Sequence, residues 1–364
     1  MKKMKILLVF SMVLAFSGCF IKEKDITQIV FPIALMISKT NEKYKLHMLV
    51  LSNSISSKIE VESGLDDTLY HTIIFEGNTI SEASEKIGVV TNGNISAIKI
   101  RSLILHESLF NNSDTTYRDV TAYIMNNPLY RTNIYVYYTK DDPDTILNIN
   151  SLNFSTNTHF YLTRPDQRHI NDFLLPSKLL NTAKSYVDNK RMFYLPSLAM
   201  STDHLKQEND GKLKEVNTYI INGGYFLTKN DTFKFVSMND LKGLRWKDDQ
   251  NYFDIELGTV NELINLKIED IDWNTSIIDG KASIDINVLS KINYNHTSLN
   301  PTQIEEKLKE RIYEEIVTTY QKNYKDIDIY LFNDYSYRTN KKIESYDTFN
   351  LNIKTTIKNT IYEF

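Results

Sequence analysis

The sequence predicts an α+β fold, a three-domain mixed α/β body of mainly antiparallel sheets with packed helices. Strand-like segments, either wholly apolar or alternating with period two, recur along the chain, whereas helical patterns are few. One segment near the C-terminus carries a full set of helix signals. The chain has 364 residues, of which 41% are hydrophobic, and this length is typical of two or three domains.

Residues 29–188 are predicted to form an N-terminal α/β domain. The segment 29–38 is almost wholly apolar, as in a strand buried on both faces, and the polar residues 40–43 make a hairpin turn to the strand 44–51. The further strands are expected at 71–75, 96–106 and 133–138. The helices are expected at 79–90, from Asp114 to just before Pro128, and from His169 to Val187, with Pro176 as an interruption.

Residues 189–262 are predicted as a middle domain, with a strand at 216–226 and a turn plus short helix at 237–246. Residues 263–364 are predicted as a C-terminal α/β domain. Its strands show period-two apolar patterns at Ile284, Ile286 and Val288 and again at Phe349, Leu351 and Ile353.

The long helix of this last domain is predicted over 301–324. Asn300 can cap it, Pro301 suits its first position, and Gln303 can complete a capping box. Apolar residues recur at four-residue steps along one side: Ile304, Leu308, Ile312, Ile316 and Tyr320. We therefore expect the helix to lie across a sheet, with Glu305 and Lys309 paired on its exposed side.

The first 18 residues are predicted to be a signal peptide. A basic start, Met1 to Lys5, precedes an apolar run over residues 6–16 that is too short to span a bilayer. The run leads into Phe16-Ser17-Gly18-Cys19, which resembles a bacterial lipobox, although an aliphatic residue is usual where Phe16 stands.

Cys19 is the single cysteine of the chain and the predicted site of lipidation, with cleavage after Gly18. Acyl chains such as palmitate would hold the mature protein on a membrane, and residues 19–28 would form the tether. The alternative is an ordinary signal cut nearby, which would leave Cys19 as an unmodified thiol.

The charge of the chain argues against nucleic acid as a partner. The signal would remove three of 42 basic side chains, against 46 acidic ones, so the mature net charge is about −7. Membrane contact is therefore assigned to the anchor. With one cysteine, no intrachain disulfide can form.

No catalytic residue, metal site or cofactor is predicted. Two acidic pairs, Asp270 with Asp272 and Asp326 with Asp328, could share a proton or hold a metal, but solvated strand ends and caps are the favoured interpretation. None of the histidines has a four-residue metal spacing: His47, His71, His106, His159, His169, His204 and His296. The chain also lacks a Gly-x-Ser-x-Gly elbow.

Tyr135 and Tyr137 are expected on one face of their strand, with Ile134, Val136 and Tyr138 on the other. They could form a recognition surface, but packing in a core or an interface is the favoured interpretation.

The order of these elements resembles the Ger(x)C family of spore germination lipoproteins, nearly end to end. Besides the lipid-bearing cysteine, the resemblance rests on five short motifs. They are Asp25-Ile26, Ile37-Ser38-Lys39, the strand Asn222 to Phe226 with the Gly-Leu-x-Trp turn Asp240 to Trp246, the helix end Tyr324 to Asp328, and Tyr337-Arg338.

The resemblance implies a non-catalytic subunit of a nutrient germinant receptor. Such a subunit would sit on the extracytoplasmic face of the inner spore membrane with two transmembrane partners, an A and a B subunit, and would scaffold or couple them. The resemblance does not say whether a small-molecule ligand binds directly.

Two other classes are weighed against this one. A lipid-anchored extracytoplasmic solute-binding protein of a transporter would share the anchor, but it should consist of two doubly wound α/β lobes. A lipid-anchored hydrolase has the least support, because no nucleophile constellation is visible.

Overall fold

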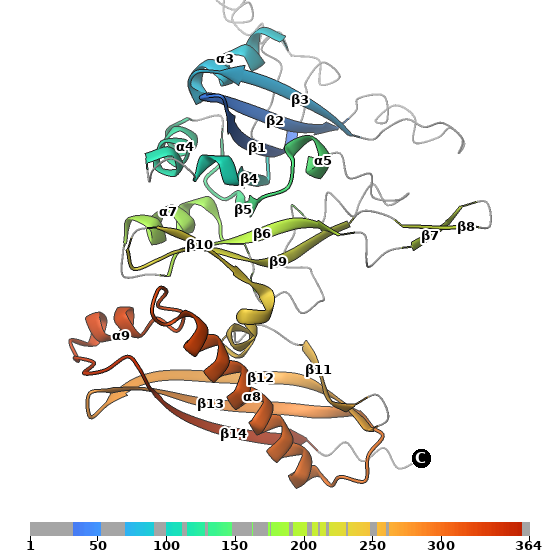
Figure 1. Cartoon of the computed structure of the whole chain (residues 1–364), viewed down its shortest axis with the longest axis vertical. Coiled ribbons are helices and arrows are strands. Elements are labelled where there is room, and N and C mark those ends of the chain that lie inside the picture. Colours follow the sequence, from blue (N-terminus) through green and yellow to red (C-terminus); the bar gives the residue numbers. More distant parts are fainter. Residues whose placement is uncertain are drawn as a thin grey trace, which may run out of the picture.

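The structure is a computed structural model, and it confirms the α+β class with an eight-stranded sheet, a four-stranded sheet and a two-stranded ribbon (Figure 1). It describes residues 32–51, 70–90, 100–110, 115–127, 130–147, 162, 174, 176–188, 192–201, 206–209, 212–215, 218–230, 232–247, 253–259 and 262–358.

The larger sheet has the strand order β10-β9-β6-β5-β4-β1-β2-β3. Its strands are β1 (Pro32–Thr40), β2 (Lys43–Leu51), β3 (Tyr70–Gly77), β4 (Ser102–His106), β5 (Tyr135–Thr139), β6 (Tyr194–Ser201), β9 (Thr218–Leu227) and β10 (Phe233–Ser237). The central strands β1, β4, β5 and β6 run parallel, and the outer pairs are antiparallel. The ribbon, β7 (Lys206–Asn209) with β8 (Lys212–Glu215), is antiparallel too.

The predicted hairpin between the first two strands is confirmed. Thr40 pairs with Lys43, and the two loop residues, Asn41 and Glu42, both have positive φ, at 50° and 64°. Such a two-residue loop has the twist that adjacent antiparallel strands need. Beside it, β1 is buried along most of its length, as expected of a central strand.

One face of the larger sheet is covered by three helices, α3 (Ile80–Val90), α4 (Thr115–Asn126) and α7 (Leu179–Val187) (Figure 1). The predicted apolar stripes of α3 and α4 are buried against the sheet: Ile80, Ala83 and Ile87, then Tyr117, Val120 and Ile124. The helix predicted from His169 to Val187 begins too early among the described residues. Residues 176–178 are not helical, because the helix begins after Pro176, at Leu179.

The opposite face of the sheet packs on α5 (Pro143–Leu147) and on the C-terminal part of the chain. Tyr137 belongs to this core and is fully buried, while the neighbouring Tyr138 is buried in the core of the other face. Core packing of the tyrosines is therefore confirmed, and a recognition surface that includes Tyr137 is wrong.

Two short 3-10 helices lie between the two sheets along the chain, where the sequence predicts a turn and a short helix. They are η5 (Met238–Asp240) and η6 (Lys242–Trp246), directly after β10; a further one, η3 (Glu107–Leu109), follows β4. The smaller sheet has the order β11-β12-β13-β14, with β11 (Phe253–Thr259), β12 (Glu262–Ile278), β13 (Lys281–Asn295) and β14 (Asn350–Lys358). Helices α8 (Pro301–Asn323) and α9 (Phe332–Thr339) complete this part, and α8 lies across the sheet (Figure 1).

The start of α8 confirms the predicted capping box. Gln303 N donates to Asn300 Oδ1 and Asn300 N donates to Gln303 Oε1, both at 3.0 Å. The predicted pair of Glu305 with Lys309 is wrong. The Glu305 carboxylate instead accepts the N–H of Ile357 in β14 at 2.9 Å, and Lys309 lies 4.0 Å from Glu306.

The three-domain division stays a prediction. Its first boundary, between residues 188 and 189, falls between α7 and β6, two elements that both belong to the larger sheet and its helical layer. The described residues do not form the two doubly wound lobes expected of a solute-binding protein, since one mixed sheet carries all the parallel strand pairs except β13 with β14.

Candidate functional site

The two residues predicted for lipid attachment, Cys19 and Gly18, lie outside the described residues, so both stay predictions. Within the described ranges, none of the helices has the length and apolar character that a membrane span requires.

The acidic pairs serve as surface groups and caps. Asp270 and Asp272 are exposed on β12, and Asp272 accepts a hydrogen bond from Asn287 Nδ2 at 3.2 Å. Asp326 and Asp328 lie in a turn after α8 rather than on a strand, and they differ in role. Asp326 pairs with Lys234, while Asp328 accepts the backbone N–H of Phe332 at 2.9 Å and so caps α9. The favoured interpretation therefore holds in part: Asp270 and Asp272 are solvated but lie within β12 rather than at its end, and Asp328 acts as a cap.

Ser38, His47 and Asp144 follow one another in space in the same order as the serine, histidine and aspartate of a hydrolase triad. Ser38 Oγ lies 3.2 Å from His47 Nε2, and His47 Nδ1 lies 3.5 Å from Asp144 Oδ1. Ser38 and His47 are each 2% exposed, so in this conformation a substrate has no access to the serine oxygen. Burial also lowers the pKa of the His47 imidazole. Among the residues described, no three His, Cys, Asp or Glu side chains group as metal ligands would.

The richest polar site lies where η5 and η6 meet α8. Three buried side chains of α8, spaced four residues apart, face this turn, and we call them the polar row: Glu315, Thr319 and Asn323. Because α8 turns once every 3.6 residues, this spacing puts them on one side of the helix, beside the apolar stripe.

Glu315 is the centre of the polar row. Its carboxylate accepts two hydrogen bonds from Arg245, one of them from Nε at 2.8 Å, and one from Trp246 Nε1 at 2.9 Å. Arg311 Nε lies 2.8 Å from the same carboxylate as an ion pair. A buried carboxylate is stable only with such a set of donors, so the site holds η6 in one orientation.

The rest of the polar row binds the backbone of the turn. Gly243 N donates to Thr319 Oγ1 at 2.9 Å, and Asn323 Nδ2 donates to the carbonyl of Asp240 at 3.2 Å. Gly243 is required by close packing, because a Cβ there would lie 2.4 Å from Tyr330 Oη and 2.7 Å from the carbonyl oxygen of Glu315. The turn after the larger sheet is thereby locked to the helix that covers the smaller sheet.

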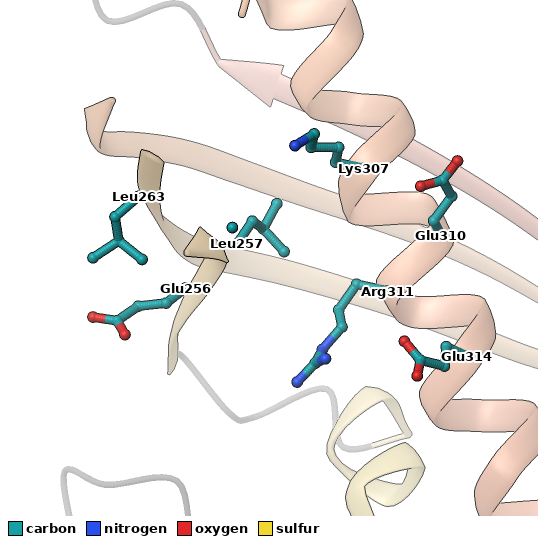
Figure 2. A pocket seen from close by; sticks show the side chains of 8 residues that line it. Glu256, Leu257, Leu263, Lys307, Glu310, Arg311 and Glu314 are labelled. Atoms are coloured by element: carbon teal, nitrogen blue, oxygen red, sulfur yellow. The ribbon is translucent and has the colours of Figure 1, made fainter. Parts of the chain in front are cut away.

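A groove of about 720 Å³ opens beside the polar row, between α8 and the β11–β12 hairpin (Figure 2). Leu257 and Leu263 contribute apolar surface, Lys307 and Arg311 line it from α8, and the carboxylate residues Glu256, Glu310 and Glu314 line it as well. Arg311 therefore contacts both the groove and the polar row. Its ion pair reaches the buried Glu315, but its Nε–H makes no hydrogen bond with any described group.

Lys247, just after η6, is a second buried charge. Its Nζ is buried and has no hydrogen-bond partner among the described residues. Burial lowers the pKa of Lys247 to about 8, with the nearby Asp328 acting in the opposite direction. Asp328 is half-buried, and this partial burial raises the pKa of its carboxyl.

The polar row fixes η5 and η6 to α8. Its charged centre, Glu315, is paired with Arg245 and Arg311. Sequence analysis singled out the turn Asp240 to Trp246 but missed the polar row. The missing signal was the four-residue spacing of Glu315, Thr319 and Asn323, one position from the apolar stripe.

A comparison with protein families finds a match in the first half of the chain. A family model described as "Spore germination protein N-terminal domain" matches residues 22–200, a range that contains β1 to β5 with α3, α4, α5 and α7. Among solved structures, the chain is similar to one titled "Crystal Structure of the GerBC protein", with 14% identity and a TM-score of 0.49. That match covers 89% of this chain and 97% of the other. No curated protein sequence matches the chain.

Proposed function

We propose that the chain is a spore germination protein of the Ger(x)C family and the lipid-anchored C subunit of a nutrient germinant receptor. The observation that carries the proposal is the match of residues 22–200 to the spore germination domain. The matched range begins shortly after Cys19, which fits an anchor that directly precedes the folded body.

In this proposal the subunit is non-catalytic and lies on the extracytoplasmic face of the inner spore membrane. Acyl chains at Cys19 would keep it there, and it would scaffold or couple two transmembrane partners, the A and B subunits. The polar row supports a coupling role, because Glu315, Thr319 and Asn323 join the larger sheet to the smaller one through η6. A force or contact on one sheet would therefore reach the other through a stiff connection.

The anchor and the receptor role are tested with Cys19→Ala. The variant loses the thiol that carries the lipid, so we expect it to move from the membrane fraction to the soluble fraction of spore extracts. Germination with the matching nutrient should fall in parallel. The control is a fusion in which a transmembrane helix replaces residues 1–18 ahead of the Cys19→Ala chain, which should restore both properties.

The two halves of the proposal fail differently. Unchanged membrane association of Cys19→Ala would contradict the lipid anchor. Release from the membrane with normal germination would contradict the receptor role. Turnover of any substrate by the purified chain would contradict a non-catalytic subunit.

A further inference from the structure

Strand β11 is an edge strand of the smaller sheet as far as the described residues show. It is the first strand in the order β11-β12-β13-β14 and pairs only with β12. Among the described residues, no backbone group of β11 makes a hydrogen bond outside that pairing. An edge of this kind presents a row of N–H and C=O groups that a further strand can satisfy.

The other edge of the same sheet, β14, is protected, whereas β11 is not. β14 carries Lys354 and Lys358, and Glu305 of α8 takes the backbone N–H of Ile357. Lysines and covering groups of this sort are how proteins prevent unwanted strand pairing. β11 contains neither lysine nor proline, and its charged residues are Asp254 and Glu256.

The groove of Figure 2 adds a side-chain site to this edge. Lys307 and Arg311 point from α8 toward the β11 side, while Glu310 points away from it. Lys307 has no ion-pair partner among the residues that the structure describes, whereas Arg311 is already paired with the buried Glu315. The unpaired ammonium of Lys307, next to Leu257, favours a carboxylate on a short apolar stem.

The exposed face of β11 is acidic. Phe253, Ile255 and Leu257 are buried, and Asp254 and Glu256, which alternate with them, are exposed. Residues directly across from each other on neighbouring strands come within about 5 Å, so opposite charges there attract. A strand added at this edge would fit best with basic side chains beside Asp254 and Glu256.

We propose that the edge of β11 and the adjoining groove bind an extended segment of a partner protein, which pairs with β11 as an additional strand. The segment alternates in charge, with acidic side chains toward Lys307 and basic side chains toward Asp254 and Glu256. This proposal goes beyond the receptor assignment, because it concerns a surface of the isolated chain and does not depend on what the whole assembly does.

The probe is a capped peptide of about ten residues in which lysine and glutamate alternate. It is added to the full mature chain, and hydrogen exchange is measured by mass spectrometry. We expect slower exchange in the segment 253–259. Two control peptides are a block arrangement of the same composition and an alternating peptide whose backbone is N-methylated at every second residue, which cannot pair. Both should bind at least tenfold more weakly.

Charge reversal on α8 tests the groove. Lys307→Glu should weaken binding of the alternating peptide about tenfold, measured by fluorescence anisotropy. The matched control is Lys309→Glu on the same helix, whose side chain does not line the groove and which should change binding less than about twofold. The proposal is overturned if the alternating peptide does not bind, if the block peptide binds equally well, if β11 gains no protection, or if the two variants weaken binding alike.

Discussion

Replacing Glu315 by glutamine should destabilise the junction between the two sheets. The glutamine keeps one acceptor oxygen, but an amide NH₂ takes the place of an oxygen that accepts hydrogen bonds from Arg245 or Trp246. The Arg245 side chain is only 14% exposed, so its charge would remain buried without a carboxylate. Breaking a buried ion pair costs about 3–5 kcal/mol. Since the amide oxygen retains some bonds, we expect a loss of about 3 kcal/mol in the free energy of unfolding.

Urea unfolding followed by tryptophan fluorescence measures this loss. The chain has two tryptophans, and Trp246 donates directly to Glu315, so the signal reports on the junction. With a slope of about 3 kcal/mol per M, the midpoint should fall by about 1 M. The control is Glu314→Gln, which removes the neighbouring exposed carboxylate and should stay within about 0.5 kcal/mol of the wild type.

A double variant separates charge from packing. Arg245→Met combined with Glu315→Leu removes both charges and should recover most of the stability lost by Glu315→Gln, because an apolar pair needs no desolvation. A Glu315→Gln protein within about 1 kcal/mol of the wild type would refute the claim that this carboxylate holds the turn in place.

Two further changes test the neighbourhood of the turn. Gly243→Ala should cost about 3 kcal/mol in urea unfolding, because the new Cβ would lie 2.4 Å from Tyr330 Oη and 2.7 Å from the Glu315 carbonyl oxygen; a change below about 1 kcal/mol would contradict this packing. Lys247→Met should stabilise the protein near pH 7 by up to about 3 kcal/mol. Burial holds the pKa of Lys247 at about 8, below its ordinary value, so folding of the wild type has to release a proton or bury a charge. As the pH rises from about 8 to 10.5, this cost to the wild type disappears, and the difference in the free energy of unfolding between the two proteins should close. A difference that does not change with pH in urea titrations would show that the amine is solvated.

Local patterns were sufficient for the elements whose signals lie close together in sequence. The two-residue hairpin after β1, the stripes of α3 and α4, and the capping box at Asn300 all followed from neighbouring residues. The errors arose where a distant segment competes for a side chain. Glu305 was expected to pair with Lys309 one turn along the helix, but β14 offers the N–H of Ile357, which lies 52 residues later in the chain. A backbone donor at a sheet edge holds a carboxylate better than an exposed lysine does.

The sequence by itself determined the α+β class, the placement of most helices and strands, and the resemblance to spore germination proteins, because hydrophobic periodicity, turn residues and short motifs are written locally along the chain. Only the tertiary structure decided that β6, β9 and β10 extend the sheet of β1 to β5, and that Glu315, Thr319 and Asn323 close on the turn Asp240 to Trp246. Strand order and buried polar contacts join residues about 70 or more positions apart, and their free energies depend on burial and on donors that no local pattern contains.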